Sequence, residues 1–117
     1  MFAFFYILNA PELLDELLAG LKQAGIQGAT IFQSTGMARV LNAQPETGNT
    51  PSMLNNIHLA MTRNRQTNMT IMSILTEEQV HTAVNAIESI VGSLAEPSHG
   101  LAFTLPIQDI WGLKRYM

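Results

Sequence analysis

The sequence predicts an α+β domain in which the order β-α-β occurs twice. Each half has an apolar run, an amphipathic helical segment and a second apolar run. These segments are Phe2–Leu8, Pro11–Ala24 and Ala29–Ser34 in the first half, and Met69–Leu75, Glu77–Val91 and Ala102–Ile107 in the second. A polar insert that contains proline and glycine, residues 36–68, separates the two halves. The repeated order predicts a ferredoxin-like β-α-β-β-α-β domain (split βαβ) with an antiparallel sheet, covering residues 1–117 as a single domain.

The first strand and the first helix have clear sequence signals. Aromatic and aliphatic residues occupy both alternations of Phe2–Leu8, which is typical of a central strand covered on both faces. The helix is predicted to begin at Pro11, because a first turn tolerates a missing N–H. Leucines recur at helical spacing from Leu14 to Leu21, and Gly25 is a natural left-handed stop. The next apolar run, Ala29–Ser34, is the predicted second strand.

The second half has a stronger helix signal. Thr76-Glu-Glu-Gln79 has the form of a capping box, in which a hydroxyl and a glutamine three residues later each bond the other residue's backbone N–H. Apolar residues then recur from Val80 to Val91, and Gly92 ends the segment. A short closing strand is predicted after it, with Pro106 near its end.

The insert, 36–68, is the segment in which we expect function. Residues 42–51 have loop composition, whereas apolar residues recur at helical spacing over 52–61 and predict a short amphipathic helix. Three of the six basic residues of the chain lie in the insert: Arg39, Arg63 and Arg65. Loops longer than about 12–15 residues in compact domains are usually functional or disordered.

Composition excludes several classes of protein. Only 13% of the 117 residues are charged, against about 25% in typical domains, so we expect apolar surface to be buried in an oligomer. A net charge of −3 without a basic tract excludes a general nucleic-acid binder. The absence of cysteine excludes disulfide scaffolds, thiolate zinc sites and cysteine nucleophiles, and fits a cytoplasmic protein.

We expect neither a leader nor membrane insertion. The apolar start, 1–8, lacks the positive residues of a secretory signal, and Pro11 and a charged helix follow at once. No apolar run reaches the ~18 residues of a transmembrane helix.

No catalytic or metal-binding set is evident. His58, His81 and His99 have no partner at a familiar metal spacing, and Glu77 and Glu78 are helix neighbours that do not face each other. Ordinary surface roles are the simpler interpretation. His99 also adjoins Gly100 in a loop that enters a strand, where binding residues are common.

Glycines and arginines form a better candidate. Gly36 and Gly100 flank strands and adjoin loops, where glycine can bring backbone N–H groups close to an anion. Together with the three arginines of the insert, they suggest phosphate recognition. The alternative is that the glycines only turn the chain and the arginines are solvated.

Three motifs in order resemble the PII-type signalling proteins, and the resemblance covers roughly Phe2 to Ile110. Gly25-Ile-Gln-Gly-Ala-Thr30 resembles their G-x-Q-G-x-T segment at the second strand. Gly36-Met-Ala-Arg39 resembles their entry into a long loop, and Gly100-Leu-Ala-Phe-Thr-Leu-Pro-Ile107 resembles their closing strand.

The resemblance implies a ferredoxin-like homotrimer that binds ATP or ADP between subunits. The long loop of such proteins docks on a transporter, an enzyme or a regulator. By position, Thr30, Gly36, Met37 and Arg39 are implied at one wall of the cleft, and His99 and Gly100 in the turn before the last strand. We add Arg63 and Arg65 from the insert, while Lys114 and Arg115 could supply C-terminal charge.

The chain also departs from the family pattern. Ala38 replaces a glycine of the loop entry, Ser98 replaces a glycine of the last turn, and Leu101 replaces a lysine there. Loss of the lysine removes a charge that would face phosphate. The insert contains no tyrosine, so regulation by tyrosine modification is not expected.

We therefore predict a divergent, non-enzymatic PII-like regulator in the cytoplasm. It would bind a small ligand, with an adenine nucleotide as the leading candidate, and relay its presence to a protein partner through the 36–68 loop. Two alternatives share the fold: a metal-binding trimer similar to the divalent-cation-tolerance proteins, and a small enzyme.

Overall fold

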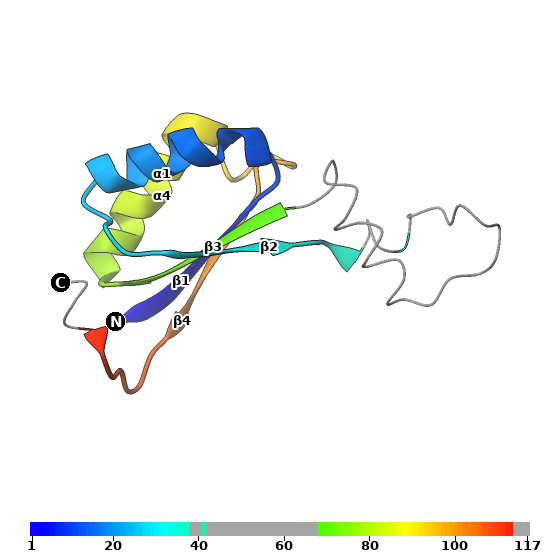
Figure 1. The fold of residues 1–117 in the computed structure, drawn as a ribbon. Coiled ribbons are helices and arrows are strands. Elements are labelled where there is room, and N and C mark those ends of the chain that lie inside the picture. Colours follow the sequence, from blue (N-terminus) through cyan, green and yellow to red (C-terminus); the bar gives the residue numbers. More distant parts are fainter. Residues whose placement is uncertain (38–40, 42–67, 114–117) are drawn as a thin grey trace.

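The computed structural model describes residues 1–37, residue 41 and residues 68–113. Its elements follow in the order β1 (Phe2–Leu8), η1 (Pro11–Leu13), α1 (Leu14–Gln23), β2 (Thr30–Ser34), β3 (Asn68–Leu75), α4 (Glu77–Val91) and β4 (Leu101–Pro106). The four strands form one sheet in the order β2-β3-β1-β4, with every neighbouring pair antiparallel. This is the predicted ferredoxin-like arrangement (Figure 1).

The predicted elements agree with the observed ones to within a residue or a turn. The first helix starts as a turn of 3₁₀ helix at Pro11 and becomes α-helical at Leu14. The last strand begins at Leu101 and ends at Pro106, one residue earlier than predicted at each end, because its bounds follow its pairing with β1. The predicted helix at 52–61 lies outside the described residues.

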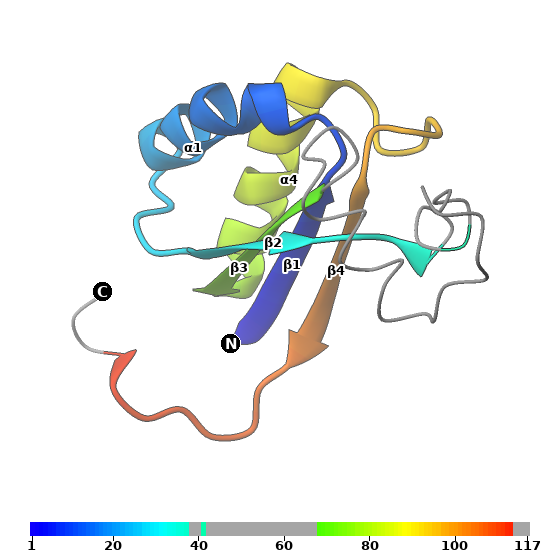
Figure 2. The ribbon, with the colours of Figure 1, turned by 45° about the vertical axis from the view of Figure 1, so that its right-hand side comes forward.

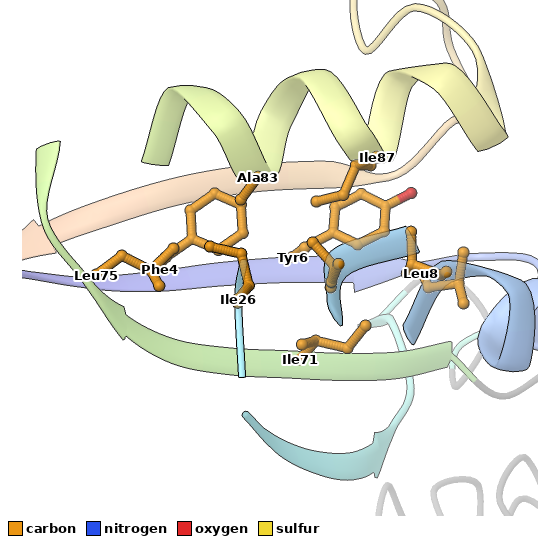
Figure 3. Packing of buried hydrophobic residues seen from close by; sticks show 10 residues of the cluster. Phe4, Tyr6, Leu8, Ile26, Ile71, Leu75, Ala83 and Ile87 are labelled. Atoms are coloured by element: carbon orange, nitrogen blue, oxygen red, sulfur yellow. The ribbon is translucent and has the colours of Figure 1, made fainter. Parts of the chain in front are cut away.

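Both helices lie on one face of the sheet (Figures 1 and 2). This is expected because β-α-β units nearly always cross over in the same, right-handed sense, so that two of them in one sheet place their helices on the same side. The core lies between these layers and consists of Phe4, Tyr6, Leu8, Leu17, Leu21, Ile26, Ile71, Leu75, Ala83 and Ile87. Figure 3 shows the rings of Phe4 and Tyr6 between β1 and α4, with Ala83 and Ile87 above them.

The face of the sheet opposite the helices corrects the prediction that the first strand is covered on both faces. The first strand is central, as predicted, but the described residues cover only the face that carries Phe4, Tyr6 and Leu8. Ala3, Phe5 and Ile7 alternate to the opposite face and are only half-buried. The side chains on both faces of β1 are apolar, but the two helices cover only one face.

The helix ends match their sequence signals. Thr76 and Gln79 form the predicted capping box, with the Gln79 backbone N–H 3.2 Å from Thr76 Oγ1 and the Thr76 N–H 2.9 Å from Gln79 Oε1. Gly25 and Gly92 both have positive φ, as expected of residues that end helices. Among the described residues, neither helix is long and apolar enough to cross a membrane.

Candidate functional site

A pocket of about 430 Å³ lies between the α1–β2 connection and the end of β3. Its wall includes the backbone from Gly25 to Thr30, the last residues of β3, and Thr76 and Gln79 at the start of α4. Met1 and Leu113 also line the pocket. Its volume is within the 300–1,000 Å³ range of small-molecule sites.

Local contacts hold the wall of the pocket in place. Ile26 is buried in the core, and its N–H donates to the Leu21 carbonyl at 2.9 Å. Two residues on, the Gly28 carbonyl accepts a hydrogen bond from the hydroxyl of Ser73, a buried residue of β3. The connection is therefore tied to both the helix and the sheet.

Of the predicted site residues that the structure describes, Thr30 alone lines this pocket. It is exposed, begins the edge strand β2 and is paired with Met72 of β3. Gly36 and Met37 follow the far end of β2. At a strand rise of about 3.3 Å per residue, Ser34 at that end already lies about 13 Å from Thr30. Gly36 and Met37 are therefore well separated from the pocket. Met37 is 74% exposed, and a Cβ at Gly36 would meet no described atom within 4 Å.

The turn before β4 holds His99 and Gly100 and is anchored by Tyr6. The Tyr6 hydroxyl donates to the His99 carbonyl at 2.7 Å, and burial raises the pKa of this tyrosine to about 12. Gly100 has a φ of +98°, and an added Cβ would lie 2.6 Å from the Tyr6 hydroxyl oxygen. Only glycine fits there without displacing the tyrosine.

The side chain of His99 also has a structural contact. Its Nδ1 lies 2.7 Å from the Ser93 carbonyl, which can only accept, so Nδ1 carries a proton. The ring lies against Gly92, where a Cβ would be 2.8 Å from His99 Cε1. In this arrangement Nε2 is the ring nitrogen that is left for a ligand.

These predicted segments do not come together within one chain. β2 and β4 are the two edges of the sheet, with β3 and β1 between them. Three interstrand spacings of about 4.8 Å separate the edges by about 14 Å. Gly36 and Gly100 therefore adjoin opposite edges of the sheet and do not lie side by side.

Other predicted groups lie outside the described residues: Arg39, Arg63, Arg65, His58, Lys114 and Arg115. Two oxygens stand where the insert meets the sheet, Thr35 Oγ1 and Asn68 Oδ1. Both are buried and have no hydrogen-bond partner among the residues that the structure describes. In the same part of the chain, no three His, Asp or Glu side chains come together as they would to hold a metal ion.

Comparison of the sequence with models of known protein families identifies the family of this chain. The family model described as nitrogen regulatory protein P-II matches residues 5–116. The chain belongs to the PII family. Proteins of this family are in general regulators rather than enzymes, and the chain is accordingly a PII-like regulatory protein. A search of curated proteins found no match.

Leu101 marks a difference between this PII protein and the family pattern. It stands where the resemblance places a lysine, and it is 57% exposed at the start of β4. It pairs with Ile7, so both lie on the face without helices. Where the family pattern has a charged residue, this chain has one that extends an apolar surface.

Two functionally placed residues were not singled out from the sequence. Tyr6 anchors the turn before β4, and Ser73 anchors the pocket wall. Each is a polar group within an apolar strand, and such a group needs a partner once it is buried. That signal predicts that a hydrogen bond exists, but the partner comes from a residue distant in the sequence.

Proposed function

We propose that this PII protein is a cytoplasmic, non-enzymatic homotrimer that binds a small ligand, with an adenine nucleotide as the leading candidate. The ligand would sit between subunits, in contact with Thr30, Gly36, Met37 and Arg39 of one copy and His99 and Gly100 of the next. Arg63 and Arg65 of the insert would complete the site. The placement of Gly36 and Gly100 at opposite edges of the sheet is the observation that carries this proposal.

The face of the sheet that lacks helices supports the trimer. Phe5 and Phe103 stack there with ring centroids 5.0 Å apart. Further apolar side chains on this face are exposed, including Phe32, Leu101 and Leu105. Contiguous apolar surface of this kind is usually covered by another protein surface. A second and third copy of the chain would cover it and also bring β2 of one copy close to β4 of the next.

The insert would relay the ligand to a protein partner, a transporter or an enzyme. Both of its ends adjoin the proposed site, because Gly36 opens the insert and Asn68 closes it at the sheet. Thr35 Oγ1 and Asn68 Oδ1 could take up new hydrogen bonds there. A ligand that binds one arrangement of the insert more tightly shifts the population toward it.

Calorimetry on the pure protein tests the ligand, and light scattering tests the assembly. We expect heat of binding from at least one of ATP, ADP, AMP or a cyclic dinucleotide, and a mass near three times the 12.9 kDa of the chain. Absence of binding by all of these compounds would reject the nucleotide as ligand. A monomeric mass would reject the site between subunits.

A further inference from the structure

The turn of residues 98–100, which leads into β4, has a strained backbone. Gly100 has a φ of +98°, and Ser98 has a φ of +76°. Among the residues that the structure describes, Ser98 is the one non-glycine residue with a positive φ. An L side chain in this region costs energy, and such a conformation persists where the surrounding structure holds it. Contacts with the rest of the fold must therefore keep the turn in this shape.

Two side chains from the β1 segment hold successive carbonyl groups of the turn. The Tyr6 hydroxyl donates to the His99 carbonyl at 2.7 Å. Asn9 Nδ2 donates to the Ser98 carbonyl at 3.4 Å, a longer and weaker bond. Because a trans peptide group is planar, its N–H points opposite to its carbonyl. The N–H groups of His99 and Gly100 are therefore directed away from these two side chains.

Tyr6 is the more rigid of the two anchors. Its side chain has no exposed surface and is part of the core cluster, so its position is already fixed by packing. Burial raises its pKa to about 12, so the hydroxyl keeps its proton at neutral pH and can donate. The bond to His99 therefore orders the turn without having to order the side chain that donates it.

We propose that Tyr6 is a positioning residue for the proposed ligand site. Its hydroxyl holds the 98–100 turn of the free protein in the shape that the ligand meets, so the cost of ordering the turn is not incurred on binding. The buried side chain acts through His99 and Gly100. The inference rests on the proposed function, because these two residues are ligand contacts only there.

Calorimetry on Tyr6→Phe tests the effect on the ligand. We expect the variant to bind ATP and ADP about tenfold more weakly than the unchanged protein, because the turn must then be ordered on binding. Ala83→Gly is the control: it weakens a buried helical position in the middle of α4, outside the turn. Its affinities should stay within about twofold. Equal losses in the two variants would assign the effect to stability in general and overturn the inference.

Amide hydrogen exchange in the free protein tests the turn without any ligand. In Tyr6→Phe we expect the amides of residues 99–101 to exchange at least about tenfold faster, after correction for the change in the core strands β1 and β3. In Ala83→Gly the turn and the core should change together. Unchanged exchange in the turn of Tyr6→Phe would reject the inference alone. Absence of ATP and ADP binding by the unchanged protein would instead reject the nucleotide site, and the inference with it.

Asn9→Ala tests which of the two anchors matters more. Since its bond to the Ser98 carbonyl is the longer one, we expect this variant to weaken ATP and ADP by less than about threefold. A larger loss in Asn9→Ala than in Tyr6→Phe would contradict the assignment of Tyr6 as the positioning residue.

Discussion

The buried hydroxyl of Tyr6 determines the conformation of the turn before β4. Its side chain has no exposed surface, and its hydroxyl bonds the His99 carbonyl at 2.7 Å. The same hydroxyl lies so close to Gly100 that glycine is required there. A single side chain on β1 therefore sets the turn that enters β4, which is one of the two segments of the proposed site.

The raised pKa of Tyr6 predicts a loss of stability at high pH. Its pKa is raised by burial from 10 to about 12, so the folded protein favours the neutral phenol. This contribution is fully present below pH 10 and is lost as the pH rises through 12. We expect the free energy of unfolding, measured with urea, to fall by about 2–3 kcal/mol across this range.

Tyr6→Phe is the control for that measurement. Without the hydroxyl, the fall above pH 10 should be absent. At neutral pH the variant should be less stable by about 1–2 kcal/mol, because the His99 carbonyl loses its partner. The same alkaline loss in both proteins would assign it to another group.

Among the secondary-structure elements, the ends of helices were easier to predict than the positions of strands in the sheet. The bounds of α4 match the prediction at both ends, because a capping box and a glycine are local signals. The strands were also located, but whether a strand lies at an edge or in the centre depends on partners far along the chain. The first strand was predicted to be covered on both faces, and the fold supplies helices for only one.

The capping box of α4 should contribute measurably to stability. Thr76→Ala removes the oxygen that accepts the Gln79 N–H, and we expect a loss of about 1 kcal/mol in the free energy of unfolding. Thr82→Ala is the matched control, because Thr82 is an exposed threonine within the same helix. Equal effects of the two substitutions would mean that the cap contributes nothing of its own.

For the whole molecule, the sheet face without helices determines how copies can meet. It carries the stacked Phe5 and Phe103 and the exposed Leu101 and Leu105. Both helices lie on the opposite face (Figures 1 and 2). Assembly through it would explain why so few charged residues are present, since much of the surface would be buried between copies.

A charge on this face should therefore disrupt the assembly. Leu105 is 53% exposed, so Leu105→Glu should leave the fold of one chain intact while placing a carboxylate in the proposed interface. We expect light scattering to show a mass near that of a single chain. Thr104→Glu is the control: Thr104 is the exposed neighbour that pairs with Phe4, and its side chain points to the helix face. An unchanged trimer in Leu105→Glu would exclude this face as the interface.

The residues of the candidate site remain a prediction, and the structure shows only where some of them lie. Thr30 lies in a pocket and Gly100 in a turn that requires glycine, but His99 uses its Nδ1 and carbonyl within the fold. The sequence could not indicate this, because Tyr6 and His99 are 93 residues apart. The arginines of the site remain a prediction, since they lie outside the described residues.

The sequence alone determined the repeated β-α-β order, the insert, the capping box and the membership of the PII family, because these depend on local periodicity and short motifs. Only the tertiary structure decided which sheet face has no helices, that Gly36 and Gly100 adjoin opposite edges, and that a pocket adjoins Thr30. The physical reason is that strand order and register come from pairing between distant segments. A local pattern specifies which residues prefer burial, but not which partner buries them.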